Sequence, residues 1–109
     1  MINWPAVIKH SDDAELIHVR DQVQWDDDAD LHSFDYNEAD CLIDSTGCVF
    51  DITNKEAGIV RPSASELVLE LKSILGLVKA HAAQSGSCCV AKLYAPTIED
   101  AYKIVESLN

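Results

Sequence analysis

The first half of the chain is patterned for antiparallel strands. In residues 4–10, Trp4, Ala6 and Ile8 occupy alternate positions, and residues 15–20 are rich in branched aliphatic side chains. Alternation and β-branched enrichment of this kind are typical of strands. Turn-forming serine and aspartate residues lie between the two segments, so we expect the segments to pair as a hairpin.

A second hairpin has the clearest pattern in the chain. Residues 41–43 and 49–52 are strand-forming, and a four-residue turn that begins with Asp44 and ends with Gly47 separates them. Aspartate at the first position and glycine at the last fit a type I turn closed by a glycine bulge. Residues 58–61 predict a further short strand.

The segment between the two hairpins carries weaker signals. Asp21 and Gln24 resemble a capping box, which predicts a short helix through Trp25. Phe34 and Tyr36 alternate with polar residues, which predicts a short strand. The aspartates between these two segments suit a helix end poorly, because their charges repel one another and oppose the helix dipole.

A helix is predicted to begin at Ser63, where Ser63 and Glu66 form a capping box that follows a proline. Gly86 is expected at the C-terminal cap of this helix. The residues between show an apolar stripe at helical spacing, made of Leu67, Leu71, Ile74, Leu75 and Val78.

The last part of the chain predicts one strand and one helix. Residues 88–95 read as a strand that Pro96 ends, and Thr97 with Asp100 caps a helix. Its inner face would carry Ala101, Ile104, Val105 and Leu108. Several strands followed by helix, strand and helix indicate an α+β fold. We therefore expect a mostly antiparallel sheet of five to six strands with two C-terminal helices packed on one face.

Length and composition agree with such a fold. The chain has 109 residues and a mass of 12.0 kDa, which predicts a single domain spanning residues 1–109. Hydrophobic residues make up 48% and charged residues 25%, so a folded chain is expected rather than a disordered one.

The charge is strongly negative and unevenly distributed. The formal net charge is −11, and residues 11–56 contain 14 acidic and 2 basic residues. This charge disfavours binding to nucleic acid and to anionic membranes, whereas a basic partner is easier to accommodate. The sequence shows no signal-peptide pattern and no run of ~20 apolar residues, so a cytoplasmic protein is expected.

No metal or cofactor site is predicted. If Asp26 were the first position of an EF-hand loop, Leu31 would replace the glycine at position six and Asn37 the glutamate at position twelve. The acidic run at 26–30 is therefore interpreted as a solvated loop. The four histidines form no zinc-peptidase motif, and no glycine-rich phosphate loop occurs. The cysteine spacing fits a zinc site poorly, and all four cysteines are expected to be reduced.

The two tryptophans are candidates for contact with a partner. Trp4 precedes a proline and Trp25 precedes the acidic run. Tryptophan is enriched among the residues that dominate binding energy at protein interfaces. Packing in the core is the commoner explanation for tryptophans, so core packing is the favoured interpretation and contact with a partner is the alternative.

Residues 42–47, Leu-Ile-Asp-Ser-Thr-Gly, resemble the active-site loop of aspartic peptidases. That chemistry needs two carboxyl groups that share a proton, so that one activates water while the other acts as an acid. One loop per chain would require two subunits, each contributing Asp44. Gly47 follows Asp44 by three positions, whereas the peptidase loop has its glycine two positions after the aspartate. An ordinary hairpin turn, in which Asp44 accepts hydrogen bonds from backbone amides, explains the same residues.

Short motifs are spread along most of the chain, namely Asn3-Trp4-Pro5-Ala6, Glu15-Leu16-Ile17, Trp25 and the Leu-Ile-Asp-Ser-Thr-Gly segment. In this combination the chain resembles domain-of-unknown-function family 4144, a family of short gammaproteobacterial proteins. The resemblance implies no settled biochemical role. It also implies an association with aspartic-peptidase self-cleavage, which favours acid-labile Asp-Pro bonds. None of the three prolines here follows an aspartate.

Two hypotheses about function follow from the sequence. The first is a small acidic intracellular protein that acts through protein–protein contacts, with self-association into a homo-oligomer through exposed sheet edges as one route. The small size and the lack of a catalytic constellation favour it, and its candidate binding residues are Trp4 and Trp25. The alternative is an aspartic peptidase that uses Asp44 from two subunits.

Overall fold

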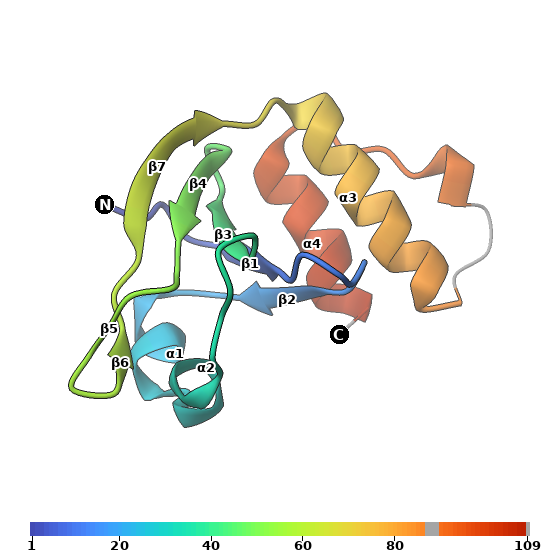
Figure 1. Ribbon diagram of the computed structural model, residues 1–109. Helices are drawn as coiled ribbons and strands as arrows, with labels where there is room; N and C mark the ends of the chain where they lie inside the picture. Colours follow the sequence, from blue (N-terminus) through green and yellow to red (C-terminus); the bar gives the residue numbers. More distant parts are fainter. Residues whose placement is uncertain (87–89, 109) are drawn as a thin grey trace.

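The chain has an α+β fold in which one antiparallel sheet carries helices on both faces (Figure 1). The computed structural model describes residues 1–86 and 90–108. The five strands run in the order β2-β1-β3-β4-β7. They are β1 (Ala6–Lys9), β2 (Leu16–Val19), β3 (Cys41–Asp44), β4 (Cys48–Asp51) and β7 (Ser63–Val68).

The helices are α1 (Gln22–Asp27), α2 (Ala29–Ser33), α3 (Leu71–Gln84) and α4 (Ile98–Leu108), with the 3₁₀ helix η1 at Val90–Lys92. The predicted fold class is therefore confirmed, including the C-terminal helices α3 and α4 on one face of the sheet (Figure 1).

Both predicted hairpins are present. β1 pairs with β2 along its whole length and with β3 on its other side, and β3 pairs with β4. The turn between β3 and β4 has the predicted form, because Gly47 has a φ of +87° and its N–H donates to the Asp44 carbonyl at 3.0 Å. This is the left-handed conformation that glycine adopts at least cost.

The predicted strand at 58–61 is also present, but it belongs to a separate small sheet. β6 (Ile59–Val60) pairs with β5 (Lys55–Glu56), and the two form a hairpin next to α1 and α2 (Figure 1). Ala57 and Gly58, which connect them, both have positive φ. Such a turn is usually recognised by asparagine or glycine at both central positions, which explains why the sequence did not predict this pairing.

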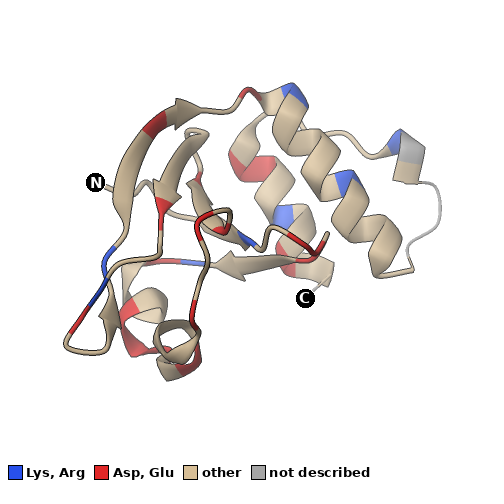
Figure 2. Ribbon diagram, viewed as in Figure 1, with Lys and Arg blue, Asp and Glu red and all other residues tan. Residues whose placement is uncertain are grey.

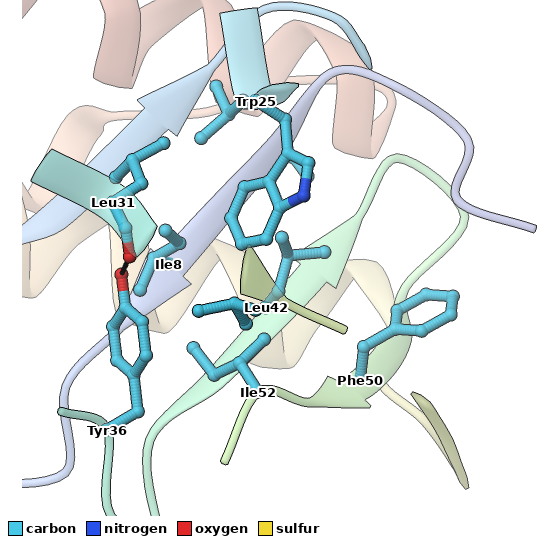
Figure 3. Close-up of a cluster of buried hydrophobic side chains, with 10 residues drawn as sticks. Ile8, Trp25, Leu31, Tyr36, Leu42, Phe50 and Ile52 are labelled. Atoms are coloured by element: carbon cyan, nitrogen blue, oxygen red, sulfur yellow. Dashed lines mark hydrogen bonds between the residues drawn. The ribbon is translucent and has the colours of Figure 1, made fainter. Parts of the chain in front are cut away.

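Alternate residues of the central strands face two separate hydrophobic clusters. One cluster lies against α3 and α4 and contains Val7, Leu16, Ile43, Val49, Ile74, Val78, Ala95, Ala101, Tyr102 and Val105. The other lies against α1 and α2 and contains Ala6, Ile8, Val19, Trp25, Leu31, Tyr36, Leu42, Phe50, Ile52 and Val60 (Figure 3). The central strands are therefore buried on both faces.

The predicted helix start at Ser63 is wrong, because residues 63–68 form strand β7. Ser65 Oγ donates to the Val49 carbonyl at 2.8 Å, and Glu66 has a φ of +70° where the register with β4 shifts. Without β7, strand β4 would expose its backbone groups at the sheet edge, and pairing outweighs the local capping signal. Helix α3 begins at Leu71, and the predicted stripe residues Ile74 and Val78 are buried in it.

Two other predicted strands are not formed in the described residues. Phe34 and Tyr36 lie in a loop, because Asp28 caps a second short helix, α2, by accepting from the backbone N–H of Asp30 and Leu31. In the strand predicted over 88–95, residues 90–92 form η1 and residues 93–95 form no strand, while 87–89 lie outside the described residues.

The remaining caps follow the prediction. The Asp21 carboxylate accepts from Gln24 N–H at 2.8 Å at the start of α1. Gly86 follows α3 with a φ of +83°. Thr97 Oγ1 accepts from Asp100 N–H at 3.1 Å at the start of α4. These caps were predictable because each depends on two residues close together in the sequence.

Two glycines with positive φ provide a test of the packing at the β3–β4 turn. A Cβ at Gly47 would lie 2.2 Å from the Leu69 carbonyl oxygen, whereas a Cβ at Gly58 would meet nothing within 4 Å. Gly58→Ala adds only backbone strain and should lower the free energy of unfolding by about 1 kcal/mol. Gly47→Ala adds a backbone clash and should lower it by about 2–5 kcal/mol. Urea denaturation followed by circular dichroism measures both, and equal losses would contradict the clash.

Candidate functional site

Asp44 lies at the end of β3. Its side chain is fully buried and accepts hydrogen bonds. Oδ1 accepts from Thr46 Oγ1 at 2.7 Å, from Thr46 N–H at 2.9 Å and from Cys48 N–H at 3.1 Å. Oδ2 accepts from Asn3 N–H at 3.0 Å. The carboxylate therefore closes its own turn and also binds the N-terminal segment to that turn.

The hydrogen bonds determine the direction in which the pKa of Asp44 moves. Burial alone raises the pKa of this carboxyl group, but the Thr46 hydroxyl and the amides of Asn3, Thr46 and Cys48 together outweigh burial and lower the pKa below its ordinary value. Asp44 is consequently ionised at neutral pH.

The same geometry gives the peptidase hypothesis no support. Two carboxyl groups that share a proton must lie about 3 Å apart. The Asp44 carboxylate is fully buried and already accepts four hydrogen bonds from its own chain. A second Asp44 from another subunit would have to open the turn and break these bonds in order to approach it.

Tyr102 was not predicted as an inward-facing residue of the last helix. Its hydroxyl donates to the Ile43 carbonyl at 3.0 Å and lies 3.3 Å from the Asp44 carbonyl. Burial raises its pKa, as do the nearby Asp44 and Cys41 groups. Its polar atom is therefore satisfied by the strand that carries Asp44. The sequence holds no signal for this contact, because the residues are 58 and 59 positions apart.

Trp4 and Trp25, the two candidate binding residues, lie together at the same surface groove of about 580 Å³. Their ring centroids are 6.4 Å apart. Trp25 is almost fully buried in the core, and Trp4 is half-buried against it. The groove lies between the N-terminal segment, α1 and β6, and it is also lined by Met1, Ile2, Gln22, Asp26, Phe50, Ile59, Val60, Arg61 and Pro62.

A chain of hydrogen bonds holds the Trp4 ring against α1. Trp4 Nε1–H donates to Gln22 Oε1 at 3.2 Å, and Gln22 Nε2–H donates to Asp26 Oδ1 at 2.9 Å. The indole N–H is thus satisfied within the protein, and the apolar ring remains available to line the groove. This arrangement forms a mostly apolar wall with a carboxylate at its rim.

Two buried histidines form hydrogen bonds with backbone groups of other elements, His32 beside the groove and His81 on the other face of the sheet. Val60 N–H donates to His32 Nδ1 at 3.1 Å, so His32 Nε2 carries the hydrogen that is donated to the Trp25 carbonyl at 2.7 Å. His81 of α3 accepts from Leu16 N–H at 3.0 Å through Nδ1. Sequence reasoning left these histidines without a role, because each bonds a backbone group distant in sequence.

The described residues contain no group of three or more His, Cys, Asp or Glu side chains arranged to hold a metal ion. The prediction that the acidic run at 26–30 is a loop is wrong: residues 26 and 27 end α1, Asp28 caps α2, and residues 29 and 30 begin α2. Cys41 and Cys48 are free thiols. Burial raises the pKa of Cys41. Cys88 and Cys89 lie outside the described residues.

No helix in the described part of the chain is long and apolar enough to cross a membrane.

Fold and groove together define a small α+β protein with an aromatic surface groove. A sequence profile of DUF4144, described as a protein structure with unknown function, matches residues 4–105. The chain belongs to this family, which confirms the resemblance found in the short motifs.

A solved structure supports the fold independently. The NMR structure of a protein from Shewanella amazonensis is similar to this chain with a TM-score of 0.72 and 25% sequence identity. The similarity covers 100% of this chain and 91% of the Shewanella chain. No protein of curated function matches the sequence.

Asp44→Asn tests the role of the buried carboxylate. Asparagine keeps one acceptor oxygen but turns an N–H₂ group toward other donors, so we expect the free energy of unfolding to fall by about 2–3 kcal/mol at pH 7. Because the folded-state pKa is lowered, the carboxylate stabilises the fold above its ordinary pKa of about 3.9 and loses this effect as the pH falls further.

The difference between wild type and Asp44→Asn should therefore be constant above about pH 5 and shrink below about pH 4. Urea denaturation at several pH values measures it. Asp12→Asn is the matched control, since Asp12 is exposed. A loss in Asp44→Asn that does not change between pH 7 and pH 3 would contradict the role of the ionised carboxylate.

Proposed function

We propose that this protein is a protein-interaction module that binds an extended segment of a partner protein in the groove at Trp4 and Trp25. The observation that carries the proposal is the gathering of both tryptophans of the chain at one concave, mostly apolar surface. A volume of about 580 Å³ suits a few apolar side chains and lies in the ordinary range for binding pockets.

The energetics of this surface favour binding. Trp4 is half-buried in the protein alone, and its indole N–H already donates to Gln22. A partner that covers the apolar ring therefore leaves no buried polar group without a hydrogen bond. Ile59 also lines the groove, is 43% exposed and offers further apolar area. Rigid aromatic anchors of this type dominate the energy of many interfaces.

Selection from a random peptide library tests the proposal. Peptides enriched on the wild-type protein should lose about five- to tenfold in affinity for Ile59→Ser, because the substitution removes apolar contact area at the groove. Val23→Ser is the matched control, since Val23 is also an exposed aliphatic residue but lies outside the groove on α1. The proposal fails if no peptide is enriched, or if every enriched peptide binds Ile59→Ser as tightly as wild type.

A second candidate function is self-association through the sheet edge at β7. All six residues of β7 are exposed, and Leu67 and Val68 are the exposed large aliphatic residues on it. β7 has β4 as its neighbour on one side and no strand of the described residues on the other. Unpaired edges of this kind pair readily with another chain. Glu66 has a positive φ at the register shift and so interrupts the strand. The apolar part of the edge is therefore the end that follows Glu66, at Leu67 and Val68.

Analytical ultracentrifugation over a range of concentrations tests this second candidate. We expect a concentration-dependent dimer in the wild-type protein and a monomer in Leu67→Lys, because an edge lysine opposes strand pairing. Val23→Lys adds the same charge at an exposed position outside the edge and should leave the dimer intact. A wild-type protein that stays monomeric at every concentration would exclude the β7 contact.

A further inference from the structure

The groove at Trp4 and Trp25 lies beside the acidic part of the molecule. Asp26 of α1 lines the groove. Further acidic residues lie along α1 and α2 (Figure 2). By contrast, α3 carries Lys72 and Lys79 and no acidic residue, and it lies on the other face of the sheet. Helix α4 lies on the same face as α3 and carries three acidic residues and one lysine, so the acidic and basic residues of these two helices balance. Helices α1 and α2 carry aspartates and no lysine or arginine, and the groove lies beside α1 on this more acidic face.

The basic side chain at the groove does not offset this charge. Arg61 lines the groove, but its Nε lies 3.8 Å from Glu56 Oε2, so the two form an exposed ion pair. Asp26 has no basic partner among the described ion pairs, and its hydrogen bond comes from the neutral amide of Gln22. Asp26 is therefore the charged side chain of the groove that is paired with no basic side chain among the described ion pairs, while Arg61 and the amino group of Met1 are the positive groups that line it.

We propose that the groove selects a partner segment with aliphatic side chains flanked by lysine or arginine. This inference rests on the proposed function and adds the chemical class of the partner. The aliphatic side chains pack between Trp4 and Ile59, and a flanking cation lies against the Asp26 carboxylate. A segment with flanking acids meets the repulsion of a surface whose residues 11–56 hold 14 acidic and 2 basic residues.

The arrangement also separates two contributions to binding. Apolar contact in the groove supplies affinity that salt does not weaken. Charge complementarity at the rim supplies selectivity and faster association, both of which fall as salt rises, because exposed charges are screened beyond about 8 Å at physiological ionic strength.

Three synthetic peptides of equal length test the inference. They share one aliphatic centre and differ in their flanks, which are lysine, serine or glutamate. Because both tryptophans of the chain line the groove, their fluorescence reports its occupation directly. At low salt we expect the lysine-flanked peptide to bind about tenfold more tightly than the serine-flanked one, and the glutamate-flanked peptide to bind weakest.

Two charge-matched variants locate the effect. Asp26→Asn keeps an acceptor for Gln22 and should weaken the lysine-flanked peptide by about two- to fivefold, as expected for an exposed ion pair. Asp27→Asn removes the same charge from α1 at a residue that does not line the groove, and it should change the affinity by less than about twofold. Neither variant should change the affinity for the serine-flanked peptide.

The outcomes distinguish this inference from the proposed function. If serine- and lysine-flanked peptides bind equally and Ile59→Ser weakens both, the groove binds a segment but the cationic class is wrong. If the lysine-flanked peptide binds and Ile59→Ser has no effect, the peptide binds the acidic surface outside the groove, and the inference is overturned. If no peptide changes the fluorescence or produces heat in calorimetry, the inference fails together with the groove as a peptide site.

Discussion

The arrangement of the groove depends on the buried carboxylate of Asp44. Its Oδ2 accepts a hydrogen bond from the backbone N–H of Asn3. The backbone N–H of Ser45 donates to the backbone carbonyl of Asn3 at 2.9 Å. The N-terminal segment is thereby attached to the β3–β4 turn immediately before Trp4. Trp4 then reaches Gln22 and Trp25 of α1 from a defined position. The motif that suggested peptidase chemistry thus contributes to the shape of a different surface.

The sheet itself was largely predictable from the sequence. Both hairpins have strands that a local pattern of strand-forming residues predicts, and the second also has a turn whose conformation Asp44 and Gly47 determine. Both signals act over fewer than fifteen residues. The caps at Asp21 and Thr97 are local for the same reason. The pattern also indicated the fold class, because strands followed by C-terminal helices leave few ways to cover a sheet.

The features that were missed depend on contacts between distant parts of the chain. Ser63 and Glu66 match a helix-capping pattern, yet this segment pairs with the edge of β4 and forms strand β7. Tyr102 and His32 are buried because each finds a backbone partner that no local pattern reveals. The tryptophans were predicted as candidates by residue type alone. That they share one groove follows from the packing of the N-terminal segment on α1, which the sequence could not show.

The attachment of the N-terminal segment has a consequence for how the family can vary. Asn3 contributes to it through its backbone N–H and carbonyl, which every residue except proline supplies in full, whereas Asp44 contributes through its side chain. Exchange of the residue at position 3 for any residue except proline therefore preserves the bond, whereas at position 44 only a side chain with an acceptor oxygen in the same place can make it. The contact thus restricts the choice of residue far more at position 44 than at position 3, although the two residues make the same bond.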